Sequence, residues 1–175
     1  MTNTDPARKE DVKDPIGKLG WPVQKGRDGE RTPMQWSGAV NAGFSAGKPW
    51  LPVPASAEKY NVASESKDPD SILNFYTRVL ALRHSEDALI NGEYVGLNES
   101  DPNVLAYLRR SAQQTILVAL NMSGSPQTLT VDLNSAGIPG AKVNTLVSTT
   151  GHPADGALQS ISLDPFSVYI GGISK

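Results

Sequence analysis

The chain has 175 residues with 16 basic and 18 acidic side chains, and a formal net charge of -2 lacks the basic excess of nucleic-acid-binding proteins. It contains no cysteine, which excludes disulfides and thiolate metal sites, and its two histidines, His84 and His152, are too few and too far apart to indicate a metal site. No apolar run approaches the roughly 20 residues that span a bilayer, and residues 1–10 carry no apolar signal core. We therefore expect no cofactor, no nucleic acid and no membrane association, and a cytoplasmic location if the chain is taken at face value.

Residues 1–66 hold seven of the thirteen prolines and show no sustained amphipathic period, so they read as irregular. A structureless segment of this length is either disordered or a functional loop. Large apolar rings, which disordered linkers lack, are spread through it at Trp21, Trp36, Phe44, Trp50 and Tyr60. We expect these rings to pack on a surface larger than the segment itself.

The most specific stretch is GRDGERTPMQW, residues 26–36, which has the composition of a contact loop. Gly26 permits a positive φ angle, and Pro33 fixes its own backbone and restricts the residue before it. The guanidinium groups of Arg27 and Arg31 suit carboxylates or vicinal hydroxyls. The simpler interpretation pairs both arginines with the neighbouring carboxylates Asp28 and Glu30.

The next segment predicts a helix of about four turns within residues 68–86, with Asp68 as N-cap and Pro69 at the first helical position. Its apolar stripe has helical spacing and consists of Ile72, Phe75, Tyr76, Val79 and Leu80, with Arg83 one turn further on.

From Gly92 onward the apolar period becomes two. Short runs rich in Val, Leu, Ile, Thr and Tyr predict strands over residues 93–97, 104–110, 115–122, 127–133, 142–149, 158–163 and 166–172. Turn signals separate them, so we expect an antiparallel sandwich or Greek-key barrel of about 85 residues. The nearly continuous apolar run at 115–122 predicts a central strand. Asp132, Asp155 and Asp164 lie at strand ends or turns, where Asp serves turn chemistry.

Residues 26–36 closely resemble the C-terminal part of α-amylase family glycoside hydrolases when they are read with three flanking blocks: DPIGKLGWP (14–22), NAGFSAGKPWLPV (41–53) and DPDSILNFYTRVLALR (68–83). The α-glucosidase and oligo-1,6-glucosidase branch is the most similar. The trehalose synthase branch shares RTPMQW and NAGFS, but the other blocks favour the glucosidases.

The resemblance implies a mainly β chain in three parts. Residues 1–66 would be the long final βα-loop of an incomplete (β/α)8 barrel, residues 67–88 its eighth helix, and residues 89–175 the antiparallel β-sandwich called domain C. Loops at this face of such barrels carry substrate-binding residues. The rings of residues 1–66 would then rest on a barrel that these 175 residues do not include.

The resemblance also implies a division of roles. Retaining glycosidases need two carboxyl groups about 5 Å apart, and the family's catalytic carboxylates come from earlier strands. Neither Asp28 nor Glu30 matches one, so no catalytic residue is expected here. Arg27 matches the arginine that contacts the non-reducing-end glucose. The scaffold of the motif is then Asp28, Arg31, Thr32, Gln35 and Trp36.

The leading interpretation is a truncated α-glucosidase that is inactive alone and meets an α-glucoside or malto-oligosaccharide only within a complete barrel. Three alternatives stay open: a trehalose synthase fragment, a piece that complements a separate barrel domain, and a free-standing carbohydrate- or partner-binding module. The rings available to such a module are Tyr94, Tyr107, Phe166 and Tyr169, whose positions fit core packing equally well. Without a barrel we expect self-association through Ile72, Phe75, Val79 and the loop tryptophans.

Overall fold

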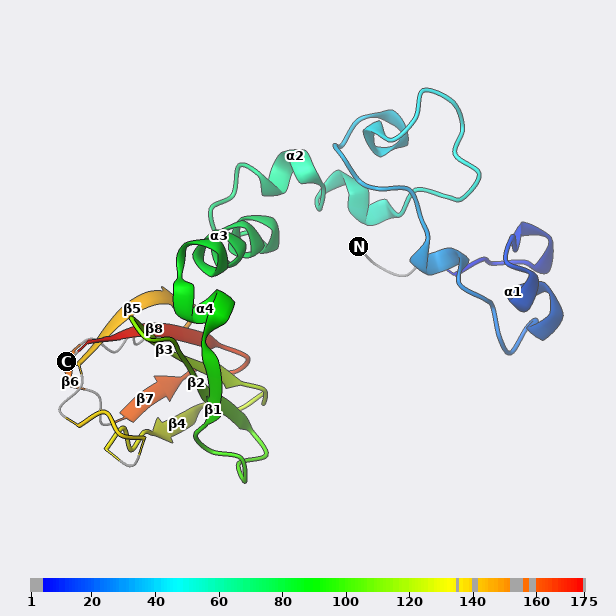
Figure 1. Cartoon of the computed structure of the whole chain (residues 1–175). Coiled ribbons are helices and arrows are strands. Elements are labelled where there is room, and N and C mark those ends of the chain that lie inside the picture. The colour runs from blue at the N-terminus through cyan, green and yellow to red at the C-terminus, as the bar shows by residue number, and fades with distance from the viewer. Residues whose placement is uncertain (1–4, 135, 140–141, 152–155, 158–159, 175) are drawn as a thin grey trace. The chain divides into compact units, whose positions relative to one another are not determined.

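The second half of the chain forms the predicted antiparallel sandwich (Figure 1). The computed structural model describes residues 5–134, 136–139, 142–151, 156–157 and 160–174. Its strands are β1 (Glu93–Gly96), β2 (Val104–Arg110), β3 (Thr115–Asn121), β4 (Gln127–Thr130), β5 (Lys142–Ser148), β6 (Gly156–Ala157), β7 (Ser160–Leu163) and β8 (Val168–Ser174). Each predicted run overlaps one of these strands, although β8 ends two residues beyond its run, and β6 is an addition of two residues.

The strands make two antiparallel sheets, one of six strands in the order β1-β2-β3-β8-β5-β6 and one that pairs β4 with β7. The central position predicted for residues 115–122 is confirmed, because β3 lies between β2 and β8. Leu108 faces Leu117 in the β2–β3 register and Ala106 faces Ala119, so one face of the large sheet is apolar. These side chains share a buried cluster with Leu129, Ile161 and Leu163 from the small sheet.

The opposite face of the large sheet carries a short helix, α4 (Asp87–Asn91). Its Ala88 and Leu89 form a second buried cluster with Ile116, Val118 and Ile170. Strand β3 is therefore buried on both faces, which explains its nearly continuous apolar sequence.

The predicted helix exists as α3 (Ile72–Ser85), but it begins three residues later than predicted, at Ile72 and not at Pro69. Asp68 accepts a hydrogen bond from the Asp70 amide (2.9 Å) and so stabilises a turn. Ser71 caps the helix in place of Asp68, because its Oγ accepts a hydrogen bond from the Asn74 amide at 3.1 Å. The hydrogen bond of Ser71 therefore identifies it, and not Asp68, as the N-cap of α3.

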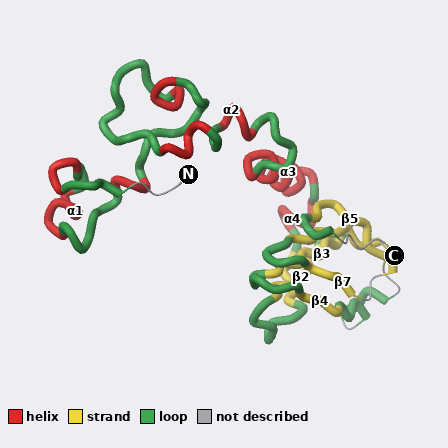
Figure 2. The backbone as a smooth tube through the Cα atoms, turned by 180° about the vertical axis from the view of Figure 1, so that it is seen from behind, coloured by secondary structure: helices red, strands yellow, loops and turns green. Residues whose placement is uncertain are grey.

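Residues 5–71 are largely loop, as Figure 2 shows, with short helical turns between. Two are α-helical, α1 (Pro15–Gly20) and α2 (Val62–Glu65), and the 3-10 turns are Lys9–Asp11, Asp28–Glu30, Val40–Gly43 and Ala55–Glu58. The chain divides into two compact units, Met1–Arg78 and Val79–Lys175. No helix among the described residues is long and apolar enough to cross a bilayer.

The two units are stabilised by different forces. Both apolar clusters found in the described residues belong to the second unit. In the first unit, buried apolar side chains are few and mostly small, whereas several buried side chains are polar: Asp14, Asp28, Gln35, Asn61 and Ser71. Trp36 and Trp50 are 51% and 74% exposed. Hydrogen bonds therefore hold the first unit more than an apolar core does.

Candidate functional site

The Arg27 guanidinium is fixed by Asp14, which lies thirteen residues earlier in the chain. Its Nε donates to Asp14 Oδ2 at 2.8 Å and its Nη2 donates to Asp14 Oδ1 at 3.4 Å. The Arg27 backbone amide donates to the same carboxylate at 3.0 Å. The interpretation that Arg27 pairs with Asp28 is therefore wrong, because Asp28 is occupied elsewhere.

The two side chains of this ion pair differ in their exposure to solvent. The Asp14 side chain is fully buried, while that of Arg27 is 48% exposed. The hydrogen bond from Arg27 is the largest cause that holds the pKa of Asp14 well below its usual range, and the same contact raises the pKa of Arg27. The carboxylate stays ionised and anchors one edge of the guanidinium of this half-exposed side chain.

Asp28 holds the backbone that carries Asp14. Its carboxylate accepts hydrogen bonds from the amides of Lys13 (2.6 Å) and Asp14 (3.0 Å). Asp14 in turn accepts from the Ile16 amide at 3.0 Å and caps α1, which begins with Pro15. The two carboxylates thus act in series: Asp28 positions Asp14, and Asp14 positions Arg27.

Two glycines allow these loop segments to approach. Gly26 has φ +80°, and a Cβ there would lie 3.0 Å from the Asp14 Cβ. A Cβ on Gly17 would lie 2.3 Å from the Lys25 carbonyl oxygen. Any larger residue would push the 12–17 segment away from the 25–28 segment and break the Asp14–Arg27 contact.

The other scaffold residues of the motif make different contacts. Gln35 is 2% exposed, and its Nε2 donates to the Tyr60 carbonyl at 3.2 Å and to Ser56 Oγ at 3.3 Å. The Trp36 carbonyl accepts from the Ala63 amide at 3.0 Å, while its ring is half exposed. Arg31 is exposed and Thr32 is half-buried. The motif therefore has two ends: Arg27 and Asp28 bind the 13–16 segment, and Gln35 and Trp36 bind residues 56–63.

Two important residues were missed from the sequence. Asp14 is one of them, although an Asp directly before a Pro is a helix-cap signal in itself. Asn61 forms a capping box with Ser64 at the start of α2 and donates to the Ala57 carbonyl at 2.9 Å. Its signal was equally local, but the helix that it caps has only four residues.

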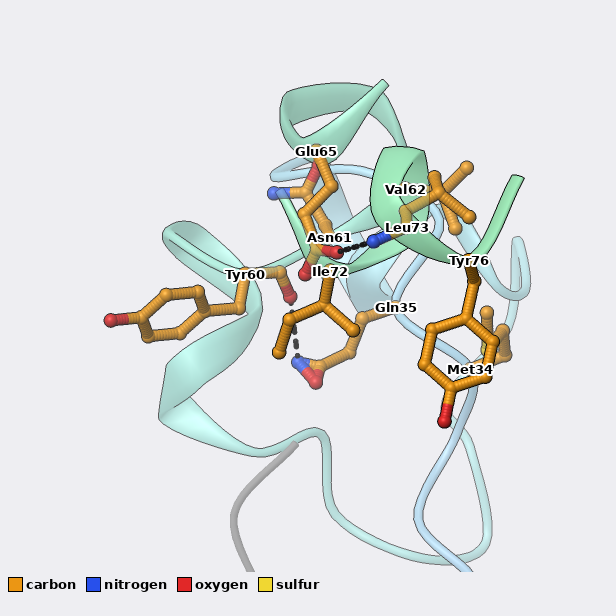
Figure 3. Close-up of a pocket in the computed structure, with 9 residues that line it drawn as sticks. All are labelled: Met34, Gln35, Tyr60, Asn61, Val62, Glu65, Ile72, Leu73 and Tyr76. Atoms are coloured by element: carbon orange, nitrogen blue, oxygen red, sulfur yellow. Dashed lines mark hydrogen bonds between the residues drawn. The ribbon is translucent and has the colours of Figure 1, made fainter. Parts of the chain in front are cut away.

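An apolar groove lies beside the start of α3, with a cavity of about 370 Å³ (Figure 3). The lining residues come from the end of the motif, from α2 and from α3: Met34, Gln35, Tyr60, Asn61, Val62, Glu65, Ile72, Leu73 and Tyr76. All of them belong to the first unit. Glu65 is occupied by the Leu73 amide at 3.2 Å, so it does not present a free carboxylate to the groove.

No group of three or more metal-ligating side chains occurs among the described residues. A glycosidase acid needs a raised pKa, whereas the carboxyl groups of Asp11, Asp14 and Asp87 shift downward through hydrogen bonds. His152 and Asp155 lie outside the described residues.

The four rings proposed for a sugar-binding module do not behave alike. Tyr169 is fully buried in the sandwich core, whereas Phe166 is 71% exposed. Tyr94 and Tyr107 have ring centroids 5.0 Å apart and planes tilted by 33°, so they do not form one flat platform.

Two family models match the chain in sequence order. The model described as "Alpha amylase, catalytic domain" matches residues 1–92, and "Maltogenic Amylase, C-terminal domain" matches residues 94–170. Oligo-1,6-glucosidase of Heyndrickxia coagulans is 44% identical over 100 residues, 57% of this chain and 18% of that protein. Probable oligo-1,6-glucosidase 3 of Bacillus subtilis (strain 168) is 32% identical over 155 residues, 89% of this chain and 27% of that protein.

Solved structures agree with these matches. The trehalulose synthase MutB from Pseudomonas mesoacidophila MX-45 superposes with a TM-score of 0.81 at 30% identity, over 99% of this chain and 34% of that one. The trehalose-6-phosphate hydrolase of Bacillus licheniformis gives 0.79 at 29% identity, over 100% and 34%. The chain thus spans less than a third of the curated relatives named above and about a third of these solved structures.

Proposed function

The chain belongs to the α-amylase family, and from this membership we propose that it is the C-terminal region of a retaining glycoside hydrolase that cleaves α-glucosidic bonds. Several relatives are named as oligo-1,6-glucosidases, and one as a probable α-glucosidase. Within the complete enzyme, Arg27 binds the substrate, an α-glucoside or a malto-oligosaccharide. The 175 residues alone do not catalyse hydrolysis.

The observation that carries the substrate role is the orientation of the Arg27 guanidinium. Nε and Nη2 are anchored on Asp14, while Nη1 makes no hydrogen bond within the described part of the chain. A half-exposed planar cation with free donors suits vicinal sugar hydroxyls. Because its edge is already fixed, little side-chain entropy is lost when a sugar binds.

Asp14 is the positioning residue for this contact. Its pKa is held low, so it stays ionised and pairs with Arg27 across the neutral range. For the same reason it is unsuited to donate a proton to a leaving group, which a glycosidase acid must do. The described residues therefore support binding and positioning, and the two catalytic carboxylates belong to the rest of the enzyme.

The test is the hydrolysis of p-nitrophenyl α-glucoside. The 175-residue chain alone is expected to show no turnover. A chimera in which the chain replaces the segment that it matches in the Bacillus subtilis relative is expected to hydrolyse the substrate. Arg27→Ala in the chimera should lower kcat/KM by about 10- to 100-fold, the value of a hydrogen bond to a charged group.

Arg8→Ala is the matched control. Arg8 also pairs with an aspartate through Nε (2.9 Å) and Nη2 (3.0 Å), but Asp11 and Arg8 are both exposed. Its removal should leave kcat/KM unchanged. Turnover by the isolated chain, or equal effects of the two arginine substitutions, would contradict the proposal.

A further inference from the structure

The pair Asn91-Gly92, at the end of α4, is the only Asn-Gly sequence in the 175 residues. Asparagine is a chemically labile residue. A glycine after it increases the lability, because no side chain hinders the attack of the next backbone nitrogen on the side-chain amide carbon. Asn91 is exposed, so water has access to its side chain. The pair therefore has the composition and the exposure of a spontaneous deamidation site.

The fold requires the glycine of this pair. Gly92 is buried and is the single residue between α4, which ends at Asn91, and β1, which begins at Glu93 (Figure 1). A Cβ at residue 92 would lie 2.3 Å from the Ala88 carbonyl oxygen and 2.9 Å from the Arg110 backbone nitrogen. A larger residue would slow the reaction but would also push α4 away from β2. The close packing of the helix end thus keeps a labile pair at this position.

The closed helix holds both reacting groups. Deamidation begins when the Gly92 nitrogen loses its proton and attacks the side-chain carbon of Asn91. The Gly92 N–H donates to the Ala88 carbonyl at 3.0 Å, and Asn91 Nδ2 donates to Asp87 Oδ1 at 2.9 Å. Both hydrogen bonds have to break before the two atoms can bond. The reaction therefore requires α4 to open.

Helix α4 is suited to open without the rest of the sandwich. It has five residues, of which Ala88 and Leu89 are buried against the large sheet. The Gln114 side chain ties its start to the sheet, because Gln114 Oε1 accepts from the Ala88 amide at 3.1 Å and Gln114 Nε2 donates to the Glu86 carboxylate. Short elements with few buried side chains open locally at a lower free energy than the core of a domain.

The product does not fit the closed helix. A bond forms between the Gly92 nitrogen and Asn91 Cγ, the bond from Cγ to Nδ2 breaks, and ammonia leaves. Water then opens the cyclic imide to aspartate or isoaspartate. Either product places a carboxylate one turn from Asp87, at a position where an amide had donated to it. Isoaspartate also adds a methylene to the backbone, which moves the Gly92 N–H away from the Ala88 carbonyl.

We propose that Asn91 is a deamidation site controlled by α4. The closed helix suppresses the reaction, local opening permits it, and the isoaspartate product prevents the helix from closing completely. This inference does not depend on the proposed function, because it concerns the second unit and needs no substrate.

Peptide mapping of the full 175-residue chain tests the proposal. Trypsin cuts after Arg83 and Arg109, so one peptide holds Asn91 together with Asn98 and Asn103, which precede larger residues and serve as internal controls. The chain is incubated in mildly alkaline buffer with and without guanidinium chloride, and fragmentation locates the mass increase that conversion of an amide to an acid gives. We expect Asn91 to react fastest of the three in the denaturant, and at least about 10-fold more slowly in the folded chain. Equal rates at Asn91 in the two conditions would overturn the proposal.

Gln114→Ala and Gln113→Ala separate the effect of α4 from intrinsic reactivity. Gln114→Ala removes the tie at the start of the helix, so deamidation of Asn91 in the folded chain should accelerate about 2- to 10-fold, with no change in the denaturant. Gln113 is the matched control, since its side chain is exposed and makes no hydrogen bond with the described residues. An unchanged rate in Gln114→Ala, or the same acceleration in Gln113→Ala, would show that α4 does not control the reaction.

The effect of the product is measured on the aged chain. Conversion of Asn91 to isoaspartate should lower the melting temperature, followed by the strand component of circular dichroism, by about 4 °C. Asn91→Asp adds the charge without the backbone change, and its effect should be about 1 °C. The reason is that the guanidinium groups of Arg83 and Arg109 lie at the same helix end, where each donates to a carbonyl of α4. An aged chain that melts with the fresh one, although Asn91 is converted, would contradict the last step of the proposal.

Discussion

Asp28→Ala should destabilise the first unit and leave the second unit unchanged. Asp28 is 6% exposed, and its carboxylate accepts from the amides of Lys13 and Asp14. The substitution removes both contacts and leaves no oxygen in their place. Since Asp14 holds Arg27, loss of the first carboxylate also loosens the second.

The magnitude follows from the two amides. A buried donor that loses its partner costs about 1–3 kcal/mol. The Asp14 amide belongs to a residue that is 3% exposed, so its cost should be near the upper end. Lys13 is exposed, so its amide can be rehydrated at lower cost. We expect the free energy of unfolding of the first unit to fall by about 3 kcal/mol, and by about 1 kcal/mol for Asp28→Asn, which keeps one acceptor oxygen.

The sequence provides a separate probe for each unit. All three tryptophans, Trp21, Trp36 and Trp50, lie in the first unit, and every strand among the described residues lies in the second. Urea unfolding followed by tryptophan emission therefore reports on the first unit, while the strand component of the far-ultraviolet circular dichroism spectrum reports on the second. A tryptophan midpoint unchanged by Asp28→Ala, or a shift confined to the dichroism signal, would refute this account.

Two further predictions use the same probes. The pKa of Asp14 is lowered from its ordinary value of 3.8, so the stability that it supplies is fully present above that pH and is lost as the pH falls from 3.8 toward the lowered pKa. The tryptophan midpoint should fall across this window, more shallowly in Asp14→Asn; identical slopes would contradict the prediction. In the second unit, Asn121 is 2% exposed and donates to the carbonyls of Ser125 (2.8 Å) and Asp164 (2.9 Å). Asn121→Leu should lower the dichroism-detected stability by about 2–4 kcal/mol and leave the tryptophan midpoint unchanged; a shift below about 0.5 kcal/mol would show that these carbonyls find other partners.

The sandwich was predictable because apolar and polar residues alternate along its strands, and this alternation is visible within each short stretch of sequence. Every second residue of β2 is buried on one face of the sheet: Val104, Ala106 and Leu108. Strand β3 is apolar on both faces because both of its faces are covered. Such patterns need no knowledge of the rest of the chain. The start of α3 was harder to predict from the sequence. Asp68 and Ser71 are both good N-cap residues, and only the observed contact with Asn74 distinguishes them.

The partner of Arg27 was not predictable from composition. Asp28 and Glu30 are its neighbours in sequence, whereas Asp14 is separated from it by α1 and a turn. Sequence proximity favours the near carboxylates, but Asp28 is already committed to the backbone of residues 13 and 14. The substrate role of Arg27 remains a proposal that the chimera tests.

The first unit shows how an irregular segment can hold an arginine side chain, that of Arg27, in place without a large apolar core. An apolar core would need the aromatic rings of this segment turned inward, yet Trp36, Phe44 and Trp50 are all at least half exposed. Hydrogen bonds from buried carboxylates and amides replace that core: Asp28 and Asp14 at one end, Gln35 and Asn61 at the other. Polar contacts are directional, so they fix the Arg27 guanidinium within a loop and leave the rings outside. Those rings, and the apolar side chains of the groove such as Ile72 and Tyr76, are therefore left exposed on the surface of this unit.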